Sequence, residues 1–268
     1  MKSPEELSEN KLMTIGGYTT REIVWFSCGV ASAVAAKLAS EQYPNCEIVY
    51  CDTLKYEHSD NARFMKDVEK WTGKEIKIIK SEKFNDIYDV FNRTKWLAGV
   101  AGARCTLELK SRVRKAYQEV GDLHIFGLTF DEQKRIDRFE RSNQDIELCW
   151  ILKEAGVTKS DCYNIIRNAC IEIPAMYKLG YNNNNCIGCV KGGAGYWNKI
   201  RTDFPDTFER MSKMERTLNV AINKSYAGDG KRKRVFLDEL PVDAGRFSKN
   251  EDIECGVMCI NPTLDLTG

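Results

Sequence analysis

The sequence predicts an α/β fold: a Rossmann-like, mostly parallel five-stranded sheet flanked by helices, followed by a cysteine-bearing helical C-terminal region. Two observations lead to this expectation. Short apolar runs alternate with segments of helical periodicity from about residue 21 to residue 127, which is typical of consecutive βαβ units. After about residue 150 the strand signal fades, while cysteines continue to occur in polar or glycine-flanked loops.

Each predicted element is a short run of one periodicity, bounded by polar residues or glycine. In chain order these are strand Ile23–Phe26, helix Ser32–Glu41, strand Ile48–Cys51, helix Asp60–Trp71, strand Glu75–Ile79, helix Phe84–Phe91, a loop over Gly99–Ala103, helix Thr106–Val120 and strand His124–Gly127. Two further helices are expected at Thr158–Ala169 and Pro205–Asn219, the latter with proline at its first position.

Composition narrows the classes of function. The formal net charge of +1 gives no global field that would attract nucleic acid or a membrane surface. No apolar run approaches the roughly 20 residues that span a bilayer. Residues Met1–Asn10 are polar and acidic and lack the apolar core of a secretory signal. We therefore expect a soluble, cytoplasmic protein.

The loop Ser27-Cys28-Gly29-Val30-Ala31-Ser32 joins an apolar strand directly to a helix. It offers backbone N–H groups, two serine hydroxyls and a helix N-terminus to one anion, and so predicts a phosphate or sulfate site. It contains neither the Gly-Lys-Ser/Thr of a Walker loop nor the three spaced glycines of a dinucleotide fingerprint. The ordinary alternative is that its small residues serve only to pack strand against helix.

Other polar residues follow the ends of neighbouring strands, where ligands bind on parallel sheets. These strand ends carry Asp52-Thr53 and Gly127-Leu128-Thr129. Asp52 either holds a ribose hydroxyl or a metal ion such as magnesium, or simply caps the next turn. Glu132 and Arg135, three residues apart, form either a surface ion pair or, through Arg135, a bidentate grip on phosphate.

Eleven cysteines are many for a cytosolic protein of this length. Closely spaced loop cysteines in a reducing compartment indicate metal or redox chemistry rather than disulfides. Cys186-x-x-Cys189 has the spacing with which two thiolates hold one ion or cluster. Cys105, beside Arg104 at a predicted helix start, is expected to favour the thiolate. This set favours a 4Fe–4S cluster, with zinc as the alternative.

The C-terminal tail adds two more cysteines, in Glu254-Cys255-Gly256-Val257-Met258-Cys259. If this segment is a flexible tail, either thiol could reach the crevice at the strand ends. The ordinary alternative is a poorly ordered chain end with exposed thiols.

Taken together, these motifs resemble the phosphoadenylyl-sulfate (PAPS) reductase family, within the PP-loop ATP-pyrophosphatase and adenine nucleotide alpha-hydrolase superfamily. The resemblance rests on the loop at 27–32, Asp52-Thr53, Arg104-Cys105-Thr106, the Glu132/Arg135 segment, Cys186-Ile187-Gly188-Cys189 and Glu254-Cys255-Gly256. It implies a sheet of the adenine nucleotide alpha-hydrolase type and a loop that binds an adenine nucleotide, which would be PAPS, adenylyl sulfate or ATP. The residues implied to bind it are Ser27, Cys28, Gly29, Val30, Ser32, Asp52, Thr53, Gly127, Glu132 and Arg135.

The resemblance also implies a reaction. In that family the cysteine of a C-terminal Glu-Cys-Gly motif attacks the sulfonate, and a thioredoxin-like partner releases the bound sulfonate as sulfite. That role falls on Cys255, while Cys105, Cys186, Cys189 and Cys259 are implied to hold the cluster. The expected function is thiol-dependent reduction of PAPS or adenylyl sulfate to sulfite.

Two departures keep other functions open. Arg104-Cys105 replaces the cysteine pair of cluster-bearing reductases, which leaves three obvious cluster ligands. A fourth ligand would have to be Cys259, Cys255 or a group from outside the chain. Three-cysteine clusters are similar to those of ATP-dependent tRNA thiolation enzymes, so adenylation and thiolation of tRNA or DNA is the first alternative. Val-Met-Cys follows Cys255-Gly256, unlike the continuation in the reductases. A non-catalytic nucleotide-binding or redox-sensing module is the second alternative, and a homodimer remains open under each.

The expected domain organisation follows from these assignments. Residues 1–18 form a flexible N-terminal tail, 19–150 the nucleotide-binding α/β domain, and 151–222 a helical region that carries the Cys-x-x-Cys motif. Residues 223–268 are expected to form a linker, rich in glycine and charge over Ser225–Arg234, and a cysteine-containing tail.

Overall fold

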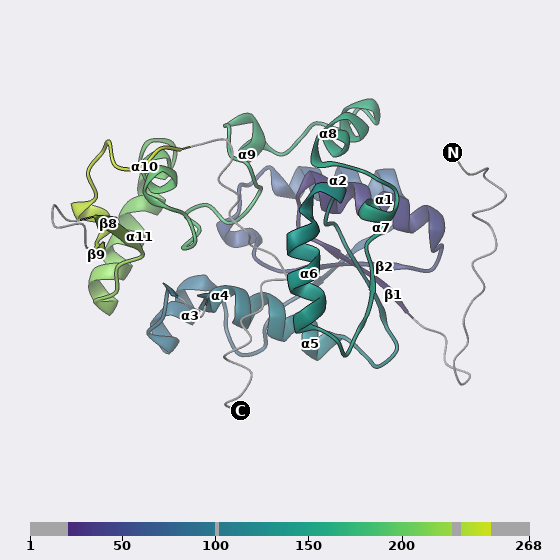
Figure 1. The fold of residues 1–268 in the computed structure, drawn as a ribbon, viewed down its shortest axis with the longest axis horizontal. Coiled ribbons are helices and arrows are strands. Elements are labelled where there is room, and N and C mark those ends of the chain that lie inside the picture. Colours follow the sequence, from purple (N-terminus) through teal and green to yellow (C-terminus); the bar gives the residue numbers. More distant parts are fainter. Residues whose placement is uncertain (1–20, 100–101, 227–231, 248–268) are drawn as a thin grey trace.

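A computed structural model describes residues 21–99, 102–226 and 232–247 of the chain. Cys255, Cys259 and the tail at 1–18 therefore lie outside the described residues. Within them, five strands form one all-parallel sheet in the order β3-β2-β1-β6-β7 (Figure 1). The predicted α/β class and the five-stranded sheet are confirmed.

The strands of this sheet are short and lie in close register. Val24 pairs with Ile48 on one side and with Ile125 on the other. The chain first adds β2 and β3 on one side of the central strand β1, and it then returns to add β6 and β7 on the other side. Such a reversal of strand order opens a crevice at the carboxyl ends of the strands. The strands are β1 (Glu22–Phe26), β2 (Glu47–Cys51), β3 (Ile76–Ile79), β6 (Leu123–Phe126) and β7 (Glu147–Cys149).

The helices alternate with these strands and continue beyond them. Those connecting or covering the sheet are α1 (Val30–Gln42), α2 (Asn61–Thr72), α3 (Ile87–Thr94), α4 (Arg104–Thr106), α5 (Arg112–Tyr117), α6 (Gln133–Ser142), α7 (Ile151–Glu154) and α8 (Lys159–Asn168). The later ones are α9 (Ala175–Lys178), α10 (Ala194–Asp203) and α11 (Pro205–Leu218). Single turns of 3-10 helix lie at Leu54–Tyr56, Phe130–Glu132 and Leu237–Glu239.

Alternate residues of β1 point to opposite faces of the sheet, as strand geometry requires. Val24 and Phe26 pack beneath α1, α2 and α8, in a cluster where alanines let α1 approach the strands closely. Ile23 and Trp25 pack on the other face against α5 and α6. Both faces are therefore covered, which explains why the strands are apolar throughout instead of alternating.

A second hydrophobic cluster lies beside the sheet, where Figure 1 shows α3, α10 and α11 on the left. It joins α3 and the segment around Leu109 to Trp197 of α10 and Met211 of α11. The chain of the α/β part thus crosses into the helical region before it completes the sheet. This cluster also contains Cys189 and contacts Cys105.

Three segments differ from the predicted elements. The predicted helix Thr106–Val120 consists of α4, a π-helical turn at Leu107–Ser111 and α5. The loop at 99–103 includes the paired strands β4 (Ala98–Gly99) and β5 (Gly102–Ala103). The segment expected as a linker contains an antiparallel pair, β8 (Asn223–Tyr226) and β9 (Arg232–Val235), because Asn223 is buried and Val235 packs on the second cluster.

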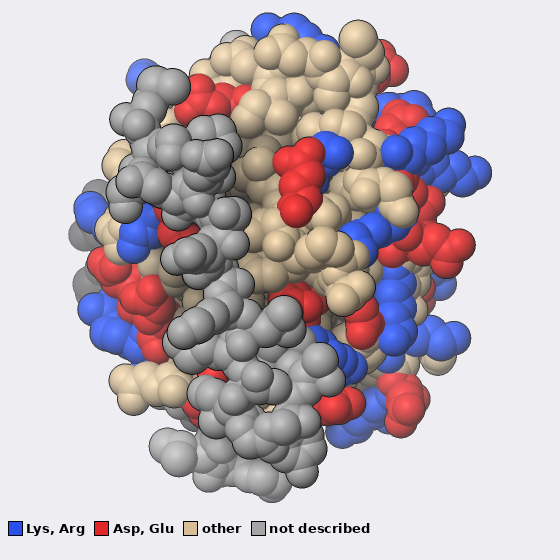
Figure 2. Space-filling model, turned by 90° about the vertical axis from the view of Figure 1, so that its right-hand side faces the viewer, with Lys and Arg blue, Asp and Glu red and all other residues tan. Residues whose placement is uncertain are grey.

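The surface shows no field of a single sign on the face drawn in Figure 2, where basic and acidic side chains are interspersed. This agrees with the net charge of +1. Among the described residues, no helix combines the length and apolar content that a membrane crossing requires.

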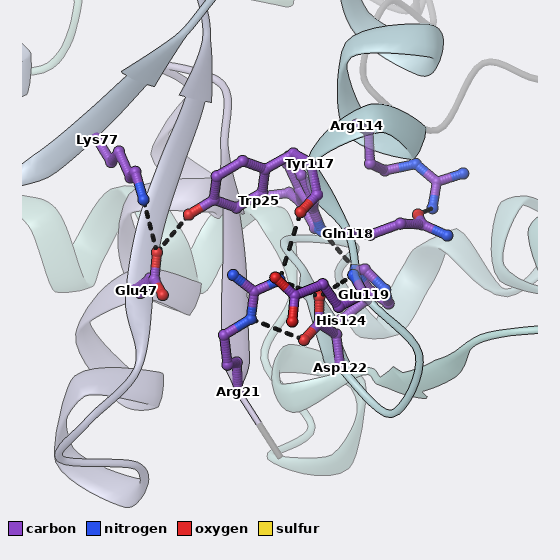
Figure 3. A network of polar contacts seen from close by, with 10 residues as sticks. All are labelled: Arg21, Trp25, Glu47, Lys77, Arg114, Tyr117, Gln118, Glu119, Asp122 and His124. Carbon is purple, nitrogen blue, oxygen red and sulfur yellow. Dashed lines mark hydrogen bonds and ion pairs between the residues drawn. The ribbon is translucent and has the colours of Figure 1, made fainter. Parts of the chain in front are cut away.

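A polar network closes the amino-terminal edge of the sheet (Figure 3). Arg21 binds Asp122 through two hydrogen bonds of 3.0 and 2.8 Å. Trp25 Nε1 donates to Nδ1 of the buried His124 at 2.9 Å, and burial lowers the pKa of His124 to about 4. The network lies at the opposite edge from the strand ends that carry the predicted site, so we assign it to stability.

Candidate functional site

Ser32 holds the loop between β1 and α1 in shape. Its hydroxyl accepts from Ser27 N–H at 3.1 Å and from Ser27 Oγ at 3.2 Å, and it donates to the Gly29 carbonyl at 2.9 Å. A serine hydroxyl has one donor and two acceptor positions, so all are used within the loop. Ser32 therefore shapes the predicted cradle and offers no spare proton to an anion in this conformation.

Cys28 makes the turn that directs the chain from strand to helix. Its φ of 57° lies in the left-handed region, which costs a non-glycine residue roughly 1–2 kcal/mol. The thiol is fully buried, and burial, followed by the nearby Glu57 carboxylate, raises its pKa well above the usual value. Cys28 therefore faces the loop's ligand side only through its backbone. The ammonium of Lys110, itself buried on the π-helical turn, acts in the opposite direction on this pKa.

Three hydroxyl oxygens surround the open side of Gly29, the N-cap of α1. A Cβ built on Gly29 would lie 3.2 Å from the Tyr177 oxygen, 3.8 Å from Ser27 Oγ and 4.0 Å from Ser32 Oγ. The absence of a side chain at Gly29 thus keeps a small polar space at the first turn of α1. Backbone N–H groups of a first turn favour an anion there.

Gly127 brings the end of β6 against the same helix turn. A Cβ at this position would lie 2.6 Å from Ser32 Cα and 2.8 Å from Ser32 N. These are backbone atoms that cannot rotate away. Gly127 is therefore required for the close approach of β6 to the cradle.

Asp52 and Thr53, at the end of β2, have different environments. Asp52 is exposed, and its Oδ1 accepts from Leu54 N–H at 3.2 Å, which is the turn-capping role. Thr53 is buried; its hydroxyl donates to Glu57 Oε1 at 2.6 Å and lies 3.2 Å from the Tyr50 hydroxyl. Asp52 is thus the residue of this pair whose side chain faces solvent.

A buried chain of polar side chains runs from Thr53 to the cradle. The second oxygen of Glu57 accepts from Asn61 Nδ2 at 2.7 Å, and Asn61 Oδ1 accepts from Asn184 Nδ2 at 2.7 Å. Asn184 Nδ2 also donates to the Cys28 carbonyl at 2.7 Å. Asn184 Oδ1 is buried without a partner among the described residues. This chain fixes the loop before Cys186 against the cradle.

Glu132 and Arg135 form an ion pair beyond the end of β6. Glu132 also accepts from the backbone N–H and the hydroxyl of Thr129, both at 3.0 Å, and so completes a capping box. These contacts are those of an ion pair, which is the alternative to a phosphate-binding role for Arg135. Arg135 keeps part of its surface exposed, so a ligand could still reach its guanidinium.

Two tyrosines hold the Cys186–Cys189 loop. The hydroxyl of Tyr196 accepts the N–H groups of Gly188 at 3.1 Å and of Cys189 at 2.9 Å. Ile187 N–H donates to the Tyr56 carbonyl at 2.7 Å, next to the end of β2. Both cysteines are almost fully buried, and a small open hollow lined in part by Met176, Tyr181 and Asn185 lies beside Cys186. The loop is therefore tied to both the helical region and the sheet.

Three of the described thiols are candidates for holding a metal. Cys105 lies on α4 and contacts the same hydrophobic cluster as Cys189. Yet no three His, Cys, Asp or Glu side chains within the described ranges are placed to hold one metal ion. A single zinc ion needs its ligands gathered around one point, whereas the cysteines of a cubane cluster each bind a different iron. The described residues thus contain no preformed site for a single metal ion, and the choice between a cluster and zinc stays a prediction.

The fold adds residues that the sequence did not single out: Glu57, Asn61, Tyr177 and Asn184. Four consecutive asparagines before Cys186 were the only signal for Asn184, and nothing distinguished it from its neighbours. The structure brings Ser27, Gly29, Ser32 and Gly127 together. Asp52 lies beyond the end of β2 and Arg135 beyond the end of β6, and these two strands flank β1. Cys186 follows Asn184 two positions later in the chain.

The chain matches a known protein family over most of its described length. Residues 21–193 match the family model described as the phosphoadenosine phosphosulfate reductase domain. No curated protein sequence matches the chain. Among solved structures, the U34-tRNA thiolase NcsA from Methanococcus maripaludis, with its 4Fe–4S cluster, is similar at 12% identity and a TM-score of 0.41, over 75% of this chain and 72% of that chain.

Proposed function

This chain belongs to the phosphoadenosine phosphosulfate reductase domain family, and we propose that it reduces PAPS or adenylyl sulfate to sulfite with thiols. Family membership indicates an enzyme that acts on an adenylylated substrate. The finer assignment, a sulfonucleotide reductase, rests on the residues of this chain.

One observation carries the proposal: a buried hydrogen-bond chain ties the cradle to the segment that leads into the Cys186–Cys189 loop. Asn184 donates to the Cys28 carbonyl of the cradle and stands two residues before Cys186. A nucleotide at the cradle would therefore have its anionic end next to the cysteine-bearing part of the chain. This arrangement would place a bound nucleotide beside the thiols that are proposed to hold the cluster, as a family of nucleotide-dependent sulfur enzymes requires.

The described residues would bind and orient the nucleotide. The first turn of α1 and the space over Gly29 would receive a phosphoryl or sulfuryl group. Asp52 is exposed at the neighbouring strand end, where its carboxylate would accept from a ribose hydroxyl. Arg135 would approach the anion from the end of β6, and the buried Lys110 adds positive charge near Cys28.

Cys255, which lies outside the described residues, is the proposed nucleophile. Its thiolate would attack the sulfuryl sulfur, and the sulfur–oxygen bond to the phosphate would break with its electron pair leaving on the nucleotide. A thiolate of a thioredoxin-like partner would then attack Cys255 Sγ, releasing sulfite and forming a mixed disulfide. The partner's second thiol resolves it, so a dithiol is oxidised while the sulfonate is reduced by two electrons.

Cys105, Cys186 and Cys189 are the residues that would hold a 4Fe–4S cluster, with Cys259 as a fourth ligand from beyond the described residues. When bound, the cluster would supply a redox-active or sulfide-carrying centre. The tyrosine contacts to the Cys186–Cys189 loop give it a fixed backbone from which both thiols can be presented.

One observation favours a second candidate function. Arg104 stands beside Cys105 where a second cysteine would complete a four-thiol set, and Arg104 is bound to Glu108 at 2.8 Å. A set of three thiols suits ATP-dependent thiolation of tRNA or DNA, in which the nucleic acid is activated by adenylation and pyrophosphate is released. That function would use the same cradle.

A sulfite-release assay tests the proposal. Reduced, anaerobic protein is given radiolabelled PAPS or adenylyl sulfate with a thioredoxin and its reductant. We expect labelled sulfite from the wild type and from Cys170→Ser, which changes an exposed cysteine, and none from Cys255→Ser. Equal release by Cys255→Ser would refute the nucleophile. Pyrophosphate release from ATP that requires tRNA or DNA, without sulfite, would establish the second function instead.

A further inference from the structure

The antiparallel pair β8–β9 forms an arm that is firmly held at its base. The carboxylate of the buried Glu215, on α11, accepts from Ile222 N–H at 2.5 Å, directly before β8, and from Leu237 N–H at 2.6 Å, two residues after β9. Asn223 of β8 is buried, and Val235 of β9 packs on the second hydrophobic cluster. Figure 1 shows the arm beside α11, at the left edge of the molecule. Glu215 thus fixes the two points at which the strands leave the helical region.

The arm carries positive charge that the described part of the chain does not neutralise. Its strands read Asn-Lys-Ser-Tyr and Arg-Lys-Arg-Val, in which every charged residue is basic. The side chains of Lys224, Lys233 and Arg234 are exposed, and no ion pair joins any of them to a carboxylate within the described ranges. The Arg234 guanidinium donates instead to the neutral carbonyls of Ala221 at 2.9 Å and Ile222 at 3.2 Å.

The basic residues of the adjoining helix α11 are paired, in contrast to those of the arm. Lys213 forms an ion pair with Glu209, one turn earlier on the helix. Arg216 binds Asp238 at 2.8 Å and Glu239 at 2.6 Å, the two acidic residues that follow β9. These carboxylates are therefore engaged by Arg216 and leave the charge of the arm uncompensated.

The strand register adds a repulsive contact. Lys224 lies directly opposite Arg234 across the two strands, and like charges in that position destabilise a strand pair. Lys233, the next residue along β9, points to the other face of the ribbon. Basic side chains therefore project from both faces. A bound polyanion would relieve the repulsion, and a two-stranded ribbon is narrow enough to enter a groove of a nucleic acid duplex.

From this arrangement we propose that the β8–β9 arm binds the phosphate backbone of a nucleic acid. Its contacts are to phosphate oxygens, which carry no base identity, so binding is independent of base sequence. The net charge of +1 for the whole chain conceals this local concentration of charge. The inference rests on none of the proposed sulfonucleotide chemistry.

The helix α11 connects this arm to the cysteine loop. Thr207, in the first turn of α11, lies against Gly188, since its Cγ2 is 2.6 Å from the position that a Cβ on Gly188 would take. The arm leaves the other end of the same helix, roughly 17 Å away at 1.5 Å per residue. A nucleic acid held by the arm thus lies within one helix length of Cys186 and Cys189.

A double variant, Lys224→Gln/Lys233→Gln, tests the proposal by fluorescence anisotropy with labelled duplex DNA and with labelled tRNA. Three phosphate contacts give the wild type a slope of about −2.7 in log affinity against log salt for the duplex, which is a loss of about 40-fold between about 50 and 200 mM salt. The double variant should reduce that slope by about two. The tighter of the two probes identifies which nucleic acid the arm binds.

The matched control is Lys66→Gln/Lys70→Gln, which removes the same charge from exposed lysines of α2 and should keep the wild-type slope. An unchanged slope in the arm variant overturns the proposal, as does an equal reduction in the control. Binding of poly-glutamate as tight as that of both nucleic acids also overturns it, because the arm would then serve any polyanion, such as an acidic protein.

Stability and activity measurements complete the test. Because Lys224→Gln removes the repulsion with Arg234, the melting temperature of the double variant in low salt should not fall below that of the wild type. Lys233→Gln alone, opposite Ser225, should reduce the slope by about one, and it decides the question if the double variant fails to fold. Sulfite release with an unchanged slope in the arm variants refutes the arm alone. Nucleic acid binding without sulfite release by the wild type refutes the proposed reaction alone.

Discussion

The side-chain amide of Asn184 donates a 2.7 Å hydrogen bond to the carbonyl oxygen of Cys28, a residue 156 positions earlier in the chain. The same amide group donates to Asn61 Oδ1, also at 2.7 Å. One buried side chain thus fastens the segment before the Cys186–Cys189 loop to both the cradle and the start of α2. The candidate nucleotide site and the thiols are coupled through it.

Asn184→Ala should lower the free energy of unfolding by about 2–3 kcal/mol, because two buried acceptors lose their donor. Nucleotide affinity should fall with it, since the Cys28 turn is no longer held. Urea denaturation and calorimetry measure the two effects. Asn183→Ala, at the half-buried neighbouring asparagine, is the matched control and should change neither strongly. Equal behaviour of the two variants would contradict the bridging role.

Gly127→Ala should destabilise the protein by at least about 2 kcal/mol, because the new methyl group meets the Ser32 backbone at 2.6 Å. It should also abolish tight nucleotide binding. Gly73→Ala is the comparison: its Cβ has open space, but its φ of 72° costs roughly 1 kcal/mol. That variant should lose stability without losing nucleotide affinity. Normal binding by Gly127→Ala would show that the cradle does not need this close packing.

The buried His124 should make stability fall in acid. Its pKa is lowered to about 4 in the folded protein, mainly by burial and then by the Arg114 cation, whereas an unfolded histidine titrates near 6.5. Between these values the unfolded chain binds more protons, so stability rises with pH through that window. The loss from pH 7 to pH 4 is about 3 kcal/mol from this group.

His124→Asn tests this effect, because an asparagine oxygen can accept from Trp25 Nε1 in place of the imidazole nitrogen. Urea denaturation at several pH values should show a flatter profile between about pH 4 and pH 6.5 for the variant than for the wild type. Two parallel profiles would assign the acid sensitivity to other groups.

Cys186→Ser and Cys189→Ser should each lower the iron and sulfide content of protein purified without oxygen. Cys170→Ser, which changes an exposed cysteine, should leave both contents unchanged. The reason is that a cluster loses a thiolate ligand in the first two variants only. Colourless wild-type protein with bound zinc would contradict the cluster, as would full iron content in Cys189→Ser.

The parts of the fold that depend on local pattern could be predicted from the sequence. Runs such as Ile23–Phe26 and Ile48–Cys51 are continuously apolar and bounded by polar residues, so they identify buried parallel strands. The fifth strand of the predicted sheet, β7, could not be located from the sequence because three residues, Glu147–Cys149, are too few to show a period. The pair β8–β9 was missed because its basic run resembles a solvated linker, although Asn223 anchors it in the interior.

The residues of the candidate site also fall into two groups: those that a local pattern predicts and those that only the fold brings together. The loop Ser27–Ser32 was predictable because the hydroxyls, the glycine and the helix start follow one another in the chain. Tyr177 and Asn184 were not, since their roles arise only when α9 and the asparagine run fold back onto that loop. Ser32 is a third case. Its position was predicted, but its role in holding the loop in shape through hydrogen bonds depends on distances that no sequence pattern contains.

The proposed function requires that the cradle of this chain bind an adenylylated sulfur nucleotide. The melting temperature of the reduced, anaerobic protein with PAPS, adenylyl sulfate, ATP or AMP measures this binding, because a ligand present at about 100 times its Kd stabilises the folded state by about 2.7 kcal/mol. We predict the largest rise with PAPS or adenylyl sulfate, and a much smaller rise for Ser32→Ala. A rise with ATP and none with either sulfur nucleotide would refute the proposed substrate.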